Sequence, residues 1–166
     1  MAEKSPVVAL LSIKPVYANA ILDGRKKVEF RKRPFKRPVS HVVIYATAPV
    51  QRIVGWFKTG HMDEMPPKIL WSKHSKIGGI SEDAFHTYYG HSERGVAIHV
   101  KQTHRLSSPV LITRISGSHP PQSFSYLPST AIELLNSLKS QLPAKRHAAK
   151  RKKSLTGKRK RKPSDL

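Results

Sequence analysis

Residues 12–33 of the chain read SIKPVYANAILDGRKKVEFRKR, and this stretch decides the fold. Pro15 suits the first turn of a helix, where its missing N–H costs no hydrogen bond, and Gly24 ends the apolar stretch that follows. Residues 27–31 then alternate polar and apolar side chains, with Val28 on the apolar side. That period of two is typical of a strand with one buried face. The stretch therefore predicts a short helix followed by a strand.

Outward from this stretch, runs of β-branched and aromatic residues predict further strands. We expect strands at residues 7–13, 41–48, 51–59, 95–101 and 110–114, with a tight turn at Pro49-Val50. Helices are expected at residues 66–74, 81–89 and 129–138, the second of them capped by Ser81. Short strands with a few inserted helices predict an α+β fold, a small and mostly antiparallel β-barrel with short helices at its rim.

The charge balance points to a polyanionic partner. Lys and Arg number 31 against 10 Asp and Glu, a net charge of +21. Such an excess favours nucleic acid, with RNA preferred over DNA, and no apolar run is long enough to cross a membrane. Cysteine is absent, which excludes disulfides and thiolate chemistry. Because the N-terminus makes a poor signal peptide, we expect a cytoplasmic protein, or a nuclear one in a eukaryote.

A boundary near Pro143 separates residues 1–143, the expected folded domain, from a basic tail at 144–166. The tail carries eleven Lys or Arg and no pattern that could form a core, so we expect it to be disordered alone. It would bind phosphates without regard to sequence, by releasing counterions, or act as a nuclear import signal. The tail residues expected to contact nucleic acid are Lys150, Arg151, Lys152, Lys153, Lys158, Arg159, Lys160 and Arg161.

The segment at 24–38 is the most unusual in the folded part. Eight basic residues surround one acid, Glu29, and are interleaved with Phe30 and Phe35. A charged face is often no more than solvated surface, yet cations that meet phosphates beside rings that stack on bases also suit RNA. We expect Arg33 to contribute to such binding.

The order of strand, Lys-Pro, short helix, Gly and Lys-Lys-x-Glu-x-Arg resembles the opening of an ASCH domain, a family of PUA-like β-barrels. The later segments IYATAPVQRIVGWF, ISEDAFHTYYG, RGVAIHV and PPQSFSYL also resemble a prokaryotic branch of that family, so the similarity spans about residues 7–136. The resemblance implies a pseudobarrel with a cleft suited to a base or an RNA segment. Lys14, Lys26, Glu29 and Arg31 would face that cleft.

Some relatives resemble N4-acetylcytidine amidohydrolases, in which a Lys, a Thr three residues later and a distant Glu carry out hydrolysis. Lys26 matches that Lys, but Glu29 stands where the Thr would be, and the distant acid is open among Glu64, Glu82 and Glu93. An enzyme using Lys26 and Glu29, an amidohydrolase or a metal-independent ribonuclease, is therefore the alternative to a binding protein. The simpler interpretation is that Glu29 pairs with a neighbouring cation or accepts a hydrogen bond from a base.

The stretch at 120–126 reads as a loop with an amide, hydroxyls and aromatic rings. Gln122, Ser123 and Tyr126 are suited to reading an unstacked base, although Phe124 and Tyr126 are equally suited to filling the end of a barrel. A protein partner is a further hypothesis, in which Phe35, Tyr88 and Tyr89 would be exposed at an interface.

The histidines show no pattern typical of a metal site. None of the nine has a short zinc-type spacing, so we expect them to be scattered and expect neither metal nor cofactor. They are His41, His61, His74, His86, His91, His99, His104, His119 and His147.

Overall fold

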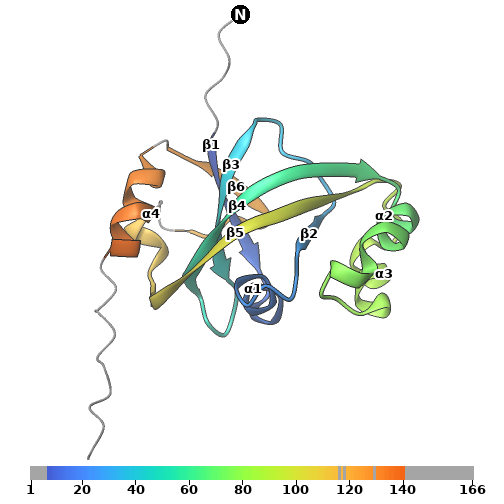
Figure 1. The fold of residues 1–166 in the computed structure, drawn as a ribbon, viewed down its shortest axis with the longest axis horizontal. Coiled ribbons are helices and arrows are strands. Elements are labelled where there is room, and N and C mark those ends of the chain that lie inside the picture. Colours follow the sequence, from blue (N-terminus) through green and yellow to red (C-terminus); the bar gives the residue numbers. More distant parts are fainter. Residues whose placement is uncertain (1–6, 116, 118, 129, 141–166) are drawn as a thin grey trace, which may run out of the picture.

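The computed structural model describes residues 7–115, 117, 119–128 and 130–140, drawn in colour in Figure 1. The tail at 144–166, with its expected nucleic-acid contacts, lies outside this part. In chain order the elements are β1 (Val7–Ile13), α1 (Pro15–Leu22), β2 (Val28–Arg31), β3 (Val39–Ala46), β4 (Arg52–Met65), α2 (Pro67–His74), the 3₁₀ turn η1 (Ser75–Ile77), α3 (Glu82–Tyr89), β5 (Gly95–Val110), the 3₁₀ turn η2 (Ile112–Arg114), β6 (Phe124–Leu127) and α4 (Ala131–Ser140).

The strands form one six-stranded sheet in the order β2-β5-β4-β3-β1-β6. Only β1 and β3 run parallel among these neighbours, so the mixed, mostly antiparallel α+β fold is confirmed. Among the described residues β2 and β6 remain edge strands, with no ladder between them. Closure into a barrel therefore stays a prediction.

The sheet buries both of its faces, because β1 sends alternate side chains into two cores. Leu11 packs in the first core with Ile21 of α1, and Leu10 packs in the second with Leu135 of α4. Gly24 ends the turn after α1 with a positive φ of 77°, which favours glycine. This turn leads into β2.

A third core lies where β4 and β5 extend past the rest of the sheet to meet α2 and α3, at the right of Figure 1. Phe30 and Phe85 meet edge to face there, with ring centroids 4.9 Å apart. Tyr89 covers Gly95 so closely that a Cβ at that glycine would lie 2.3 Å from the ring. These contacts fix α3 beside β2.

Two sequence expectations were wrong. Residues 110–114 do not form a strand of their own: β5 runs on to Val110, paired with Ile53 of β4, and a 3₁₀ turn follows at Ile112–Arg114. Residues 120–126 are not wholly a loop, because β1 offers an edge with which Phe124–Leu127 pair as β6. Of the described helices, none has the length and apolar character that crossing a membrane requires.

Candidate functional site: a cavity floored by buried charges

A cavity of about 590 Å³ opens beside the residues that the sequence singled out. Its walls come from the end of β1, the start of α1, β2, the segment before β6 and the exposed side of α3. Lys14 and Gln122 line it and are exposed, whereas Lys26, Glu29 and Arg31 line it and are buried. A volume of this size is typical of small-ligand sites.

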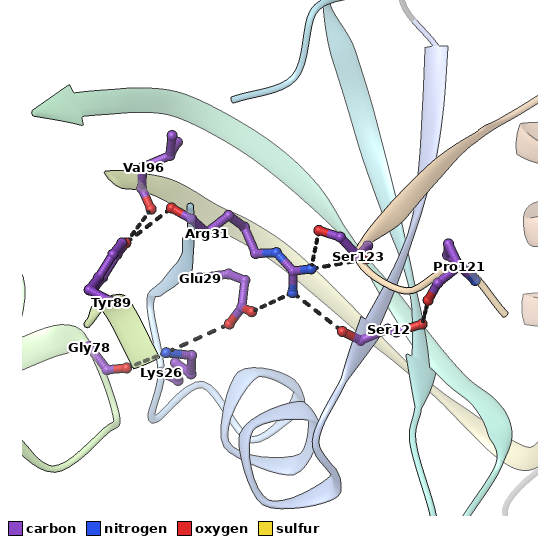
Figure 2. A network of polar contacts seen from close by, with 9 residues as sticks. All are labelled: Ser12, Lys26, Glu29, Arg31, Gly78, Tyr89, Val96, Pro121 and Ser123. Carbon is purple, nitrogen blue, oxygen red and sulfur yellow. Dashed lines mark hydrogen bonds and ion pairs between the residues drawn. The ribbon is translucent and has the colours of Figure 1, made fainter. Parts of the chain in front are cut away.

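Three charged side chains are buried together in the cavity wall. Lys26, Glu29 and Arg31 are 2%, 5% and 8% exposed. Figure 2 shows the Glu29 carboxylate lying between the two cations. Its oxygens are 3.7 Å from Lys26 Nζ and 3.5 Å from Arg31 Nη1. Because water screens buried charges poorly, Lys26 and Arg31 both depend on Glu29 for their counter-charge.

Lys26 is held by contacts on several sides. Its ammonium donates a hydrogen bond to the carbonyl of Gly78 and lies over the rings of Tyr17 and Phe30, 5.4 Å and 4.9 Å from their centroids. Burial lowers the pKa of Lys26, and the nearby Glu29 carboxylate only partly opposes that shift. The side chain is thus a positioned, poorly solvated amine, the state in which lysine serves either as a structural cation or in acid–base chemistry.

Arg31 connects the β2 edge of the sheet to the segment before β6. Its guanidinium donates to the Ser12 carbonyl at 3.3 Å and to the Ser123 carbonyl and hydroxyl at 2.9 and 2.7 Å (Figure 2). Its Nε is buried and makes no hydrogen bond. Tyr89 donates its hydroxyl proton to the Arg31 carbonyl at 3.1 Å, so α3 is tied to the same residue. One side chain therefore spans the gap between the two sheet edges.

The other residues named from the sequence lie off the cavity. Ser123 acts through its bonds to Arg31, as described above. Tyr126 accepts a hydrogen bond from the Lys36 amide at 2.9 Å, with the Arg37 guanidinium 5.4 Å from its ring centroid. Arg33 is exposed and does not line the cavity. The binding roles assigned to these residues stay predictions.

Sequence reasoning missed the wall that α3 supplies. Asp83, Thr87 and Tyr88 line the cavity from that helix, and Tyr17 and Thr47 line it from α1 and the turn after β3. Glu82 is the first residue of α3, which Ser81 caps, but the neighbouring Asp83 is the acid that lines the cavity. Residues 83 and 87, and likewise 84 and 88, are four positions apart, which places them on one face of a helix. This spacing was the sequence signal that could have revealed the wall.

Two further expectations are corrected. None of Glu64, Glu82 and Glu93 lines the cavity, and Glu64 instead pairs with Arg94 at 3.1 Å. Phe35 and Tyr89 are not exposed: they are 8% and 1% accessible, because both are long aromatic side chains that fill gaps between elements. Tyr88 alone of the three aromatics proposed for a protein interface is exposed, at 37%.

The histidines are not all scattered, either. His61, His74 and His99 gather around Asp63 at the junction of β4, β5 and α2. None of these four residues lines the cavity. Burial is the main cause of the lowered pKa of His74, whereas the hydrogen bond with His99 is the main cause of the lowered pKa of Asp63. Sequence spacing could not reveal the group, because the sheet register assembles it.

Comparison with known proteins found relatives that are similar in sequence and in fold. An ASCH domain-containing ribonuclease from Zymomonas mobilis is 30% identical over 139 residues, which cover 81% of this chain and 93% of that protein. The crystal structure of the Zymomonas mobilis ASCH protein superimposes with a TM-score of 0.73 at 29% identity, over 81% of this chain and 96% of that one. A large ribosomal subunit protein uL22 of Ureaplasma parvum is 25% identical over 75% of this chain, which spans 40% of that protein. The ASCH domain family model matches residues 11–101, and the chain accordingly belongs to the ASCH domain family.

Proposed function

We propose that this protein binds single-stranded RNA and seats one unstacked nucleotide in the cavity beside α3. The observation that carries the proposal is the combination, in one cavity of about 590 Å³, of the Glu29 carboxylate with the rings of Tyr17 and Tyr88. Proteins that read single-stranded RNA stack splayed bases on aromatic rings and hydrogen-bond to their edges. A nucleobase is small enough for such a site.

The polar groups of the cavity suit the edge of a base. Each Glu29 oxygen faces one cation, Lys26 or Arg31, and a carboxylate retains further lone pairs for other donors. A base amino group is such a donor. The Gln122 amide at the opening both donates and accepts. We therefore expect cytosine, adenine or guanine to be preferred over uracil, which has no amino group.

The surroundings of the cavity suit the phosphate backbone. Lys14 lines it and is exposed, and the exposed Arg33 follows β2. The folded part at 1–143 carries 20 basic and 9 acidic residues, so its own field attracts polyanions. In this proposal the tail at 144–166 adds affinity that depends on salt and not on sequence.

Fluorescence anisotropy with a labelled single-stranded RNA tests the binding proposal. Lys14→Ala and Gln122→Ala change exposed cavity residues and should each weaken binding by about 1 kcal/mol, roughly fivefold. Lys58→Ala and Gln102→Ala are the matched controls, because these side chains are exposed but do not line the cavity. All four variants keep the full tail, so the differences isolate the cavity. Equal effects of the cavity variants and their controls would refute the assignment.

A ribonuclease is the second candidate function, and the observation in its favour is the Zymomonas mobilis ASCH ribonuclease, of which this chain covers 93%. In that case Lys26 and Glu29 are the expected catalytic pair, and Thr47 and Thr87 line the same cavity. End-labelled RNA run on a denaturing gel would show discrete fragments. Lys26→Met should abolish them while circular dichroism confirms folding, whereas uncut RNA with wild-type protein would leave binding as the function.

A second assay tests the amidohydrolase interpretation. N4-acetylcytidine is offered as a nucleoside, and release of acetate is followed by chromatography. Glu29 has no hydroxyl on which to form the acetyl ester that a threonine could form, and attack by its carboxylate would give a reactive mixed anhydride instead, so we expect no release of acetate. Acetate release that Lys26→Met removes would instead favour an amidohydrolase over a ribonuclease.

A further inference from the structure

A group of three imidazoles and one carboxylate lies outside the cavity. His61 and Asp63 come from β4, His99 from β5 and His74 from the last turn of α2. The antiparallel register sets Met62 opposite Ile98, so His61 is placed beside His99 and Asp63 lies two residues on, on the same face. Three elements therefore bring metal-ligating side chain types to one point.

All three imidazoles direct the same ring nitrogen at the same oxygen. The Nε2 atoms of His74 and His99 each lie 2.9 Å from Asp63 Oδ2, and that of His61 lies 3.6 Å from it. The rings of His61 and His99 stack with centroids 3.7 Å apart, which keeps their nitrogens side by side. The ligand atoms of His61, Asp63 and His99 all fall within 4.8 Å of one another.

His74 supplies an independent sign that the group is incomplete. Its side chain is only 9% exposed, and its Nε2 lies 2.9 Å from Asp63 Oδ2 in a geometry that is poor for a hydrogen bond. One carboxylate oxygen is a poor acceptor for three imidazoles at once, whereas a cation among His61, Asp63 and His99 would take one ligand atom from each.

We propose that His61, Asp63 and His99 bind a divalent transition-metal ion, with Zn²⁺ as the best fit and His74, whose Nε2 lies 2.9 Å from Asp63 Oδ2, as the fourth ligand. Zinc takes imidazole nitrogens and carboxylate oxygens in a tetrahedral set, whereas Mg²⁺ and Ca²⁺ prefer oxygen ligands alone. Tetrahedral bonds of about 2.0–2.1 Å separate the ligand atoms by about 3.3 Å. The observed separations of 2.9–3.6 Å between the nitrogens and Asp63 Oδ2 bracket that value.

The proposed site has a structural consequence for the cavity. His74 ends α2, and the turn that follows leads directly to Gly78, whose carbonyl accepts the hydrogen bond from Lys26. A metal that ties His74 to β4 and β5 would fix this turn and, through it, the buried lysine.

The test uses the full, untagged chain after a chelator has stripped it of metal. Zinc affinity is measured by competition with a chromophoric chelator. Co²⁺ is then added in place of zinc to record the visible absorption bands of a tetrahedral site. His61→Ala is the key variant, because its side chain is 68% exposed and its loss should not unfold the protein. His91→Ala removes another exposed histidine and is the matched control.

The expected result is one tightly bound zinc in wild type and in His91→Ala, with affinity at least about tenfold weaker in His61→Ala, since even groups that only orient ligands account for about 10–100-fold. Zinc should raise Tm in the first two proteins and much less in the third. Failure of wild type to bind zinc overturns the proposal. Equal affinity of wild type and His61→Ala also overturns it, because the ion would then be held elsewhere in the chain.

Discussion

The buried carboxylate of Glu29 offers the sharpest test of what stabilises this fold. Glu29→Gln keeps the shape of the side chain but removes the charge 3.7 Å from Lys26 Nζ and 3.5 Å from Arg31 Nη1. At an effective dielectric constant of about 20, each contact is worth about 4–5 kcal/mol before desolvation is subtracted. Breaking such a buried pair typically costs about 3–5 kcal/mol, because the partner charge is left uncompensated.

Urea unfolding followed by circular dichroism measures this loss. Glu64→Gln is the control, because Glu64 pairs with Arg94 where their side chains are 44% and 61% exposed, and such pairs contribute at most about 1 kcal/mol. Adding Lys26→Met to Glu29→Gln should recover part of the loss, since one uncompensated cation is then removed. A loss for Glu29→Gln no larger than for Glu64→Gln would refute the reasoning, since the buried cations would not need the carboxylate.

Two further predictions concern Lys26 and its neighbours. Gly79→Ala should destabilise the fold by about 1–3 kcal/mol more than Gly90→Ala. Both glycines have a positive φ, but only a Cβ at Gly79 would lie 2.7 Å from the Lys26 side chain. Equal losses of stability in urea unfolding would contradict that contact. Burial lowers the pKa of Lys26 from 10.5. Between that lowered pKa and pH 10.5, the folded chain has released the Lys26 proton, whereas the unfolded chain still binds it. Folding stability contributed by Lys26 therefore rises with pH in that alkaline window, and the difference in unfolding free energy between wild type and Lys26→Met should increase there. A difference that stays constant with pH would show that burial does not shift this group.

Local pattern was enough to predict the elements near the start of the chain. The apolar run at 7–13, Pro15 at a helix start and the alternation at 27–31 each describe structure that neighbouring residues determine, and β1, α1 and β2 follow those bounds closely. The length of β5 was not predictable in this way. Its second half is mostly polar, with Leu106 as its one buried residue, and pairing with β4, such as Gly55 with Arg105, keeps it extended.

The residues of the candidate site also differ in whether local sequence could predict them. Lys26, Glu29 and Arg31 are close in sequence and at a turn between helix and strand, so a short motif was sufficient to gather them. Asp83 and Tyr88 reach the same cavity only because α3 packs beside β2 through the third core. No local pattern records that packing, and the contacts that create it join residues more than 50 positions apart.

The position of Glu29 explains how the chain accommodates its departure from the amidohydrolase pattern. A threonine at this position would leave Lys26 and Arg31, both buried, without a nearby anion. The carboxylate removes that problem and still offers lone pairs for a ligand donor, but a side chain that neutralises two cations is poorly suited to act as a nucleophile. The charge arrangement thus favours recognition of a base at Glu29. If the protein also cleaves RNA, we expect any hydroxyl chemistry to come from another wall of the cavity, where Thr47 and Thr87 lie.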